Sequence, residues 1–149
     1  MEKGNRIDPL RIALVCMALM LLTLVYVFQH LNYFQGLNAI LGGALPGTGA
    51  WVFVVNRTAR LVVNDLLCMA LVHGLFANKN YLRLAFYLFL LEVMVVLPLY
   101  LWAKLHWEGT SEISSPLLSP IHRMVVNPLL MVLLIVALFY QQRAEKGKA

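Results

Sequence analysis

Four apolar runs dominate the hydropathy pattern of the chain. They cover Ile12–Phe28, Leu61–Ala77, Leu84–Trp102 and Met124–Tyr140. Together with its flanks, each run can cross the roughly 30 Å of hydrocarbon in a bilayer as an α-helix. Helices suit that role because they satisfy their own backbone hydrogen bonds in lipid. The pattern therefore predicts an all-α integral membrane protein with four transmembrane helices.

The polar breaks between these runs set the expected boundaries within a single membrane domain, residues 1–149. Asn78, Lys79 and Asn80 predict a tight turn between two antiparallel helices. Ser119 followed by Pro120 is typical of a helix start, and Pro128 should kink the helix that follows. We expect helices at about 10–29, 58–77, 81–102 and 120–142, with outer loops at 30–57 and 103–119.

Composition and charge agree with a membrane protein. Of the 149 residues, 61% are hydrophobic and 13% are charged, whereas charged residues make up about a quarter of a soluble domain. The net charge of +5 does not indicate nucleic-acid binding, because the basic residues gather at one side of the predicted spans. By the positive-inside rule that side is cytoplasmic, so both termini should face the cytoplasm.

Polar groups recur at the mouths of two apolar runs. On a helix that advances about 100° per residue, Arg57, Arg60 and Asn64 share one narrow sector, and Asp65 borders it. A second polar group precedes the last apolar run. We define the polar patch by its seven members: Arg57, Arg60, Asn64, Asp65, His122, Arg123 and Asn127.

The polar patch has two interpretations that the residues leave open. Ionisable groups inside a span cost several kcal/mol unless they are paired or hydrated, so they are candidates for a functional site. The patch could dock a membrane partner or an anionic group, since guanidinium groups suit carboxylates and phosphates. It could equally be an internal salt bridge that joins two helices. For Arg123, which opposes the helix dipole, Asp65 is the expected acidic partner.

Glu92 is a further intramembrane acid. It lies near the expected midplane, deeper than Asp65, with no cation one turn away. Glu92 must therefore be protonated or paired across helices. Pro98, one to two turns later, could shape a small polar cavity or be a tolerated membrane proline.

Catalysis finds little support. An aspartyl membrane protease needs two carboxylates in one site, and the expected depths separate Asp65 from Glu92. Cys16 and Cys68 lack the spacing of a metal or redox site, so no metal or cofactor is expected. Two alternatives remain: a membrane hydrolase or transpeptidase that uses His122 and Asp65, and a small proton-coupled transporter that uses Glu92.

Several runs carry a resemblance to a known family. They are Asn56-Arg57 through Arg60 to Asn64-Asp65, the run HRMVVNPLLMVLLIVALFYQQ from His122, and the element Asn32-Tyr33-Phe34. In these the chain resembles the exosortase F-type system-associated small membrane proteins of Bacteroidota. It departs from their pattern in having Asn127-Pro128 and His122-Arg123, where glutamine–proline and paired arginines are expected.

The resemblance implies an accessory role without enzymatic activity. Such proteins are linked to the machinery that trims and anchors C-terminal membrane signals. The implied setting is the bacterial inner membrane, and the implied partners are the lipid bilayer and an exosortase-type membrane protease.

Overall fold

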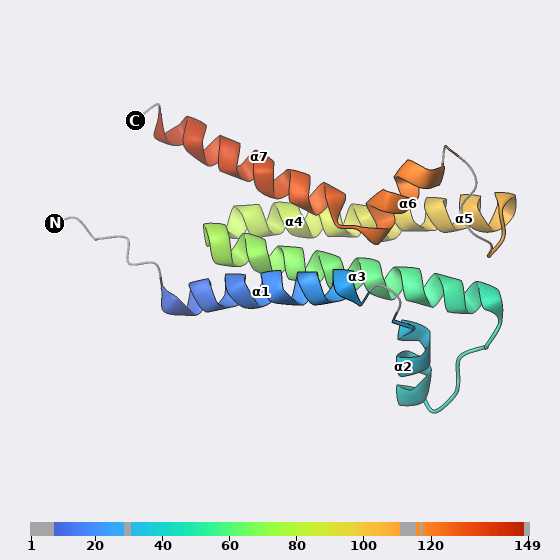
Figure 1. Ribbon diagram of the computed structural model, residues 1–149. Coiled ribbons are helices and arrows are strands. Elements are labelled where there is room, and N and C mark those ends of the chain that lie inside the picture. Colours follow the sequence, from blue (N-terminus) through green and yellow to red (C-terminus); the bar gives the residue numbers. More distant parts are fainter. Residues whose placement is uncertain (1–7, 29–30, 111–115, 117, 148–149) are drawn as a thin grey trace.

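The chain folds into a bundle of helices (Figure 1). The computed structural model describes residues 8–28, 31–110, 116 and 118–147. Helix α4 continues through the π-helical turn η1 into α5, so these three form one rod. The elements are α1 (Pro9–Val27), α2 (Tyr33–Ile40), α3 (Gly49–Phe76), α4 (Lys79–Leu91), η1 (Glu92–Val96), α5 (Leu97–Trp107), α6 (Leu118–Val126) and α7 (Leu129–Lys146).

The predicted all-α class is confirmed, and the described residues hold three to four candidate membrane spans. Helices α1 and α3 and the rod Lys79–Trp107 are each long and apolar enough to cross a membrane. Helices α6 and α7 make a fourth span if they are counted together, but they meet at an angle of 69°. The break falls at Asn127 and Pro128, where the sequence predicts a kink because proline has no N–H to continue the helix.

Helix α3 begins earlier than the sequence suggests. Its first residue is Gly49, whereas the hydropathy pattern predicts a start near Thr58, so the expected outer loop 30–57 contains α2 and the first turns of α3. The physical reason is local. From Ala50 to His73 no proline or glycine interrupts the chain, and apolar residues such as Trp51 and Phe53 continue the helical pattern.

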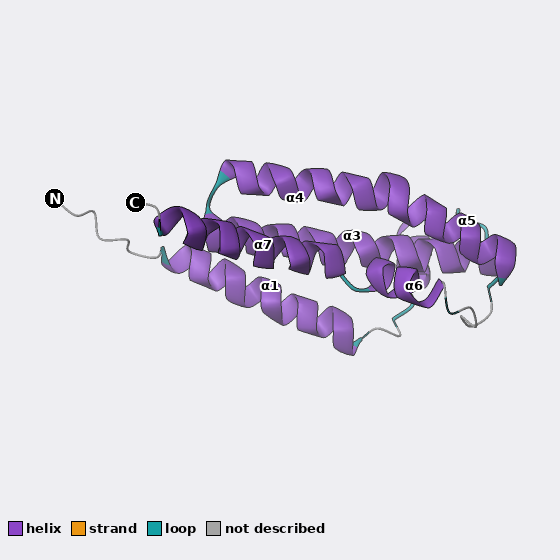
Figure 2. Cartoon of the chain, turned by 90° about the horizontal axis from the view of Figure 1, so that it is seen from above, coloured by secondary structure: helices purple, strands orange, loops and turns teal. Residues whose placement is uncertain are grey.

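Helix α3 is the central element of the bundle. It contacts α1, α2, α4, η1, α5, α6 and α7. From above, α1 and α4 lie on opposite sides of α3 (Figure 2). The expected turn after α3 is confirmed: Ala77 has a φ of 47° and ends the helix, and the Asn78 side chain accepts a hydrogen bond of 2.9 Å from the Asn80 N–H. Helices α3 and α4 therefore form an antiparallel hairpin.

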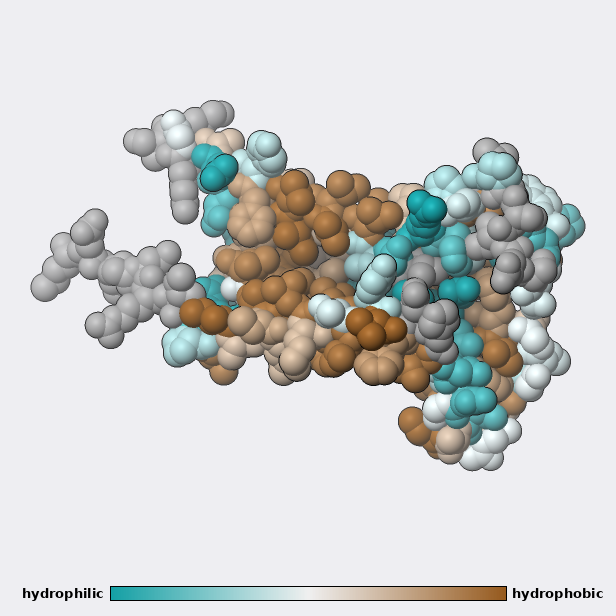
Figure 3. Space-filling view, viewed as in Figure 1, coloured by the Kyte–Doolittle hydropathy of each residue, from teal (hydrophilic) through white to brown (hydrophobic). Residues whose placement is uncertain are grey.

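Apolar side chains cover much of the surface. They spread over α1 and α7 on the face seen in Figure 3, whereas hydrophilic side chains gather around α6 and at the two ends. In α1 the buried residue is Ala18, while Met17, Leu19 and Met20 are exposed. An exposed apolar surface of this extent fits a lipid environment.

The contact between α1 and α3 depends on Gly74. A Cβ at this position would lie 2.6 Å from Val15 Cγ2 and 2.9 Å from Leu14 Cδ2. Because Val15 is β-branched and stiff, α1 would have to move.

Gly74→Leu should destabilise the fold by about 1–3 kcal/mol, lowering the melting temperature in detergent by several degrees.

A glycine in open space provides the control for this prediction. A Cβ added to Gly36 in α2 would meet no atom within 4 Å, so Gly36→Ala should leave the melting temperature unchanged or slightly higher. Equal melting temperatures for Gly74→Leu and the wild type would contradict close packing of α1 on α3.

Candidate functional site

Two carboxyl groups meet inside the bundle. Asp65 on α3 and Glu92 at the start of η1 are each 1% exposed, and their side chains are close enough to interact directly. No donor in the described part of the chain is hydrogen bonded to Asp65 Oδ1, Asp65 Oδ2 or Glu92 Oε1. We call Asp65 and Glu92 the acid pair.

The acid pair lies between two apolar clusters. Toward the α3–α4 turn, Cys68, Val72 and Ala85 belong to one buried cluster, and toward the other end Leu61 and Leu97 belong to a second. On α3 the sequence order is Leu61, then Asp65, then Cys68, so the acid falls in the gap between the clusters. The carboxyl groups therefore have apolar packing on both sides.

The expected separation in depth between Asp65 and Glu92 is wrong. It counts depth from a helix start near Thr58, and the helix begins nine residues earlier. The contact between the two acids can be predicted by counting residues from the turn between α3 and α4. Asp65 precedes Ala77 by twelve residues and Glu92 follows Asn78 by fourteen, so both lie about 18–21 Å from the turn at 1.5 Å per residue.

The backbone changes its winding at Glu92. From Glu92 to Val96 the rod is π-helical, and the Leu97 N–H donates to the carbonyl oxygen of Glu92. Pro98 follows within the first turn of α5 and has no N–H to give to the preceding turn. Single π-helical turns inside α-helices are frequent at functional sites.

Arg60 occupies a different face of α3. It is 5% exposed and makes no hydrogen bond or ion pair with any residue that the structure describes, and its Nε is buried. It lines a cavity of about 130 Å³ between α1, α3 and the α6–α7 break; the other lining residues are Leu22, Val25, Tyr26, Asn64, Asn127 and Pro128. We call this space the Arg60 cavity. Three members of the polar patch meet there: Arg60, Asn64 and Asn127.

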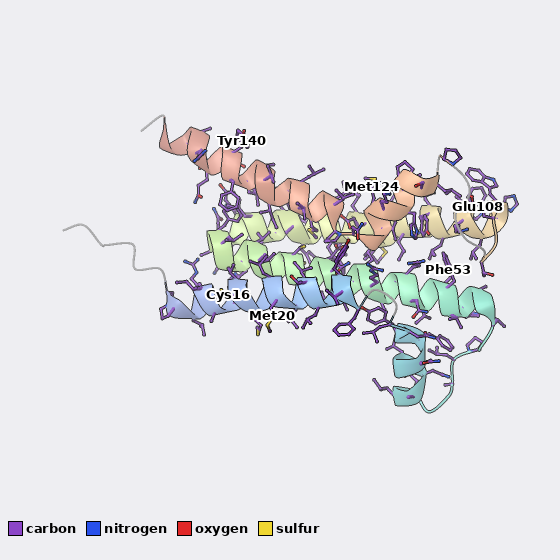
Figure 4. All side chains as sticks on the ribbon, viewed as in Figure 1. Cys16, Met20, Phe53, Glu108, Met124 and Tyr140 are labelled. Atoms are coloured by element: carbon purple, nitrogen blue, oxygen red, sulfur yellow. The ribbon has the colours of Figure 1, made fainter. Side chains whose placement is uncertain are left out.

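Arg57 lies outside the Arg60 cavity. Its guanidinium carbon is 5.3 Å from the centre of the Phe53 ring, a cation–π contact. Both residues line a pocket of about 370 Å³ at the end of the bundle where α3 begins. Phe53 is labelled at that end in Figure 4, together with Glu108, and far from Cys16 and Tyr140.

Asn56 joins α2 to α3. Its Oδ1 accepts a hydrogen bond of 2.8 Å from the Phe34 N–H, and its Nδ2 donates one of 3.1 Å to Asn32 Oδ1. The first of these satisfies a backbone donor in the first turn of α2. The Asn32-Tyr33-Phe34 element and the Asn56-Arg57 run are thus in contact through two hydrogen bonds, both made by the Asn56 side chain.

His122 pairs with a tyrosine. The Tyr100 hydroxyl and His122 Nδ1 are 2.6 Å apart in a hydrogen bond, and Tyr100 is 1% exposed. Arg57, Arg60 and Lys104 are close enough to act on His122 electrostatically. No hydrogen bond joins His122 to Asp65, both of which are described, so the geometry does not assemble the pair that a hydrolase would use.

The ion pair expected between Arg123 and Asp65 does not form. Arg123 is exposed on α6 and lines a shallow pocket with Pro116 and Ser119, whereas Asp65 is buried against Glu92. Among the described residues the structure holds one salt bridge, of 2.7 Å between Lys104 Nζ and Glu108 Oε2, and it lies outside the polar patch. The interpretation of the patch as an internal salt bridge is therefore wrong for the described residues.

Comparison with known proteins adds no identification. The chain matches no protein-family model, no curated protein and no solved structure.

In the part of the chain that the structure describes, no group of three or more His, Cys, Asp or Glu side chains is arranged to hold a metal ion.

The contribution of the part-buried hydrogen bond between Tyr100 and His122 to stability should be measurable. Tyr100→Phe removes the hydroxyl and leaves a partly buried ring nitrogen without its partner, which should lower the free energy of unfolding by about 1–3 kcal/mol. Tyr87→Phe is the matched control, because Tyr87 on α4 is exposed. Equal unfolding curves for the two variants in the same detergent would show that the hydrogen bond does not stabilise the fold.

Proposed function

We propose that this is a non-enzymatic membrane protein that binds an anionic group of a membrane partner at Arg60. The observation that carries the proposal is the burial of Arg60 beside an open cavity with no counter-ion among the described residues. A buried arginine inside a span costs several kcal/mol unless it is paired. An anion in the Arg60 cavity would supply the missing partner.

The shape of the cavity limits what can enter. About 130 Å³ is ample for a carboxylate or phosphate group, since one water needs only ~10–15 Å³ of such space. It is too small for a whole lipid or peptide. The remainder of the ligand would lie outside, along the apolar surface of α1. The proposed ligand is thus a carboxylate or phosphate carried by a membrane-embedded molecule, held by two guanidinium N–H groups.

We further propose four spans with both ends of the chain on the cytoplasmic side of a bacterial inner membrane. The start of α1, the α3–α4 turn and the end of α7 lie at one end of the bundle (Figure 1). These segments carry Arg11, Lys79, Arg83 and Arg143, which supports a cytoplasmic position under the positive-inside rule.

The proposed partner is an exosortase-type membrane protease, and the role is that of an accessory protein in protein sorting. This part of the proposal is supported by the resemblance of the Asn56–Asp65 and His122–Gln142 runs alone. Chemically it agrees with an anion site, because a sorting protease acts on chains whose products carry a new carboxylate.

Arg60→Met tests the proposal through two changes in melting temperature: the variant should be at least as stable as the wild type without ligand, and it should lose the stabilisation that the ligand gives. Methionine keeps much of the volume and removes an unpaired buried charge, so the ligand-free variant should melt at a temperature equal to or above that of the wild type. Dodecyl phosphate added to detergent-purified protein should raise the melting temperature of the wild type and leave Arg60→Met unchanged.

Two controls make the measurement specific. Dodecanol has the same alkyl chain without the charge and should produce no shift. Arg83→Met removes an exposed cation on α4 and should keep the full response to dodecyl phosphate. A shift that survives in Arg60→Met, or a wild type that ignores dodecyl phosphate and sodium dodecanoate alike, would refute the anion site. Loss of a co-purified sorting protease in Arg60→Met, but not in Arg83→Met, would then support the accessory role.

A further inference from the structure

The acid pair has a deficit of hydrogen-bond donors. Three of the four carboxyl oxygens, two on Asp65 and one on Glu92, are buried without a donor from the described residues. Burying a polar group without a partner destabilises the fold, because the hydrogen bonds to water that it loses are not replaced. A proton on one carboxyl turns it into a donor for the other, so a single bound hydrogen relieves much of this deficit.

Other charged groups do not compensate the acid pair. On α3 the nearest titratable side chain is the buried thiol of Cys68, which the pair affects electrostatically. Five charged residues of α1, α4 and α7 lie toward the end of the bundle that holds the α3–α4 turn, away from the acid pair: Arg11, Lys79, Arg83, Arg143 and Glu145. Other titratable groups of these elements are engaged elsewhere or face other sites: Tyr26 and Arg60 at the Arg60 cavity, Tyr33 on α2, Arg57 on Phe53, Tyr100 on His122, Lys104 on Glu108, and Arg123 at the surface. Tyr81 packs on Phe76 and His106 on Trp102, while His73, Tyr87 and Tyr140 are exposed.

Electrostatics then limits the charge that the pair can carry. Two carboxylates in contact and in apolar surroundings repel strongly, because burial removes them from the screening of bulk solvent. Two acids that share a site therefore ionise in separate steps, and the first ionisation opposes the second. At neutral pH the stable arrangement carries one proton between the two side chains.

We propose that Asp65 and Glu92 form an intramembrane proton-binding site that holds one shared proton between α3 and η1. The site stands on the contact and burial of the two carboxyls and on their three unpartnered oxygens. It is separate from the Arg60 cavity, which involves neither carboxyl. The proposal does not depend on the anion-binding function.

A lipid-soluble carbodiimide tests for the proton directly. The protonated carboxyl adds across one C=N bond: its oxygen bonds to the central carbon and its proton moves to nitrogen. The acyl group then migrates from oxygen to nitrogen and gives a stable N-acylurea, so nothing leaves and no oxidant is needed. Ionised carboxylates lack the proton that this addition requires. The experiment uses the full chain in detergent or lipid, with the modified peptide identified by mass spectrometry.

We expect modification of Asp65 or Glu92 at neutral pH, with at most one adduct per chain. The rate should fall about tenfold per pH unit once the shared proton is lost, because it follows the protonated fraction. The double variant Asp65→Asn/Glu92→Gln should give no adduct. Two carboxyls of the same chain are controls that should stay unmodified: Glu108, which is ion-paired with Lys104, and Glu145, which is exposed.

A second measurement detects the proton without a reagent, in case the carbodiimide does not reach the buried carboxyls. Infrared spectra of the folded protein at neutral pH should contain the C=O band of a protonated carboxyl, shifted in D2O and absent from the double variant. A folded wild type with neither adduct nor band would overturn the proposal. An adduct or band that persists in the double variant would overturn it as well, by placing the proton elsewhere.

The shared proton also predicts how the stability of the folded protein depends on pH, and the direction of that dependence follows from proton binding. The folded pair holds a proton that two separate, hydrated carboxyls in the unfolded chain release, so the folded state binds more protons. Stability should therefore fall as pH rises through the loss of that proton, and this fall should be absent from the double variant. Melting temperatures from mildly acidic to alkaline pH measure it, because hydrated carboxyls of the unfolded chain already ionise at about pH 4. Parallel profiles for the two proteins would contradict the shared proton.

Discussion

The register of the α3–α4 hairpin is the constraint on which the rest of the structure depends. The turn at Ala77 and Asn78 fixes how far each residue of α3 lies from its neighbour on the returning rod. Because the two helices run antiparallel with the same rise per residue, residues at similar counts from the turn lie at similar depth. This brings Asp65 to Glu92, and it also aligns the apolar residues on either side into two clusters. A change in the length of the turn would separate the acids and disorder both clusters together.

Helix α3 presents opposite chemistry on two faces. Asp65 faces the rod and meets another acid, whereas Arg60, just over one turn away, faces α1 and the α6–α7 break. A direct ion pair would have satisfied both charges, yet the helical angle between positions 60 and 65 is about 140°, so the side chains diverge. The bundle therefore holds an unpaired cation and a donor-poor acid pair near each other. Such an arrangement is costly for stability, and this cost is the physical reason for proposing that these groups bind a ligand or a proton.

The sequence predicts the outline of the fold well, because the outline follows from hydropathy and from a few local signals. Long apolar runs identify the helices, the Asn78-Lys79-Asn80 segment identifies the turn, and Pro128 identifies the break before α7. The start of α3 escapes the same reasoning. Residues 50–55 are apolar, but the polar residues Asn56, Arg57 and Thr58 separate them from the long apolar run, so the hydropathy pattern places the start of the helix after this break.

The candidate site is predicted less completely than the fold. The sequence identifies the polar residues, but it does not give the rotation of each helix about its axis, which decides which side chains meet. Of the seven residues of the predicted polar patch, Arg60, Asn64 and Asn127 line the same cavity. The partners of Asp65, Arg123 and His122 depend on how the helices rotate about their axes, and the order of polar residues along the chain does not contain that information. Glu92 could still have been matched to Asp65 by counting from the turn, which needs no knowledge of helix ends.

The π-helical turn at Glu92 links the acid pair to the neighbouring proline. An α-helix that reached Pro98 unchanged would leave a carbonyl without its donor, since proline has no N–H. Widening the preceding turn, from Glu92 to Val96, shifts the phase of every residue that follows. Leu97 and Tyr100 then face the bundle and are buried beside Leu61 and Val125, and the Tyr100 hydroxyl reaches His122. The same adjustment begins at the residue whose carboxyl meets Asp65. The π-helical turn thus allows one continuous rod to direct two side chains to different neighbours: Glu92 contacts Asp65 on α3, and Tyr100 contacts His122 on α6.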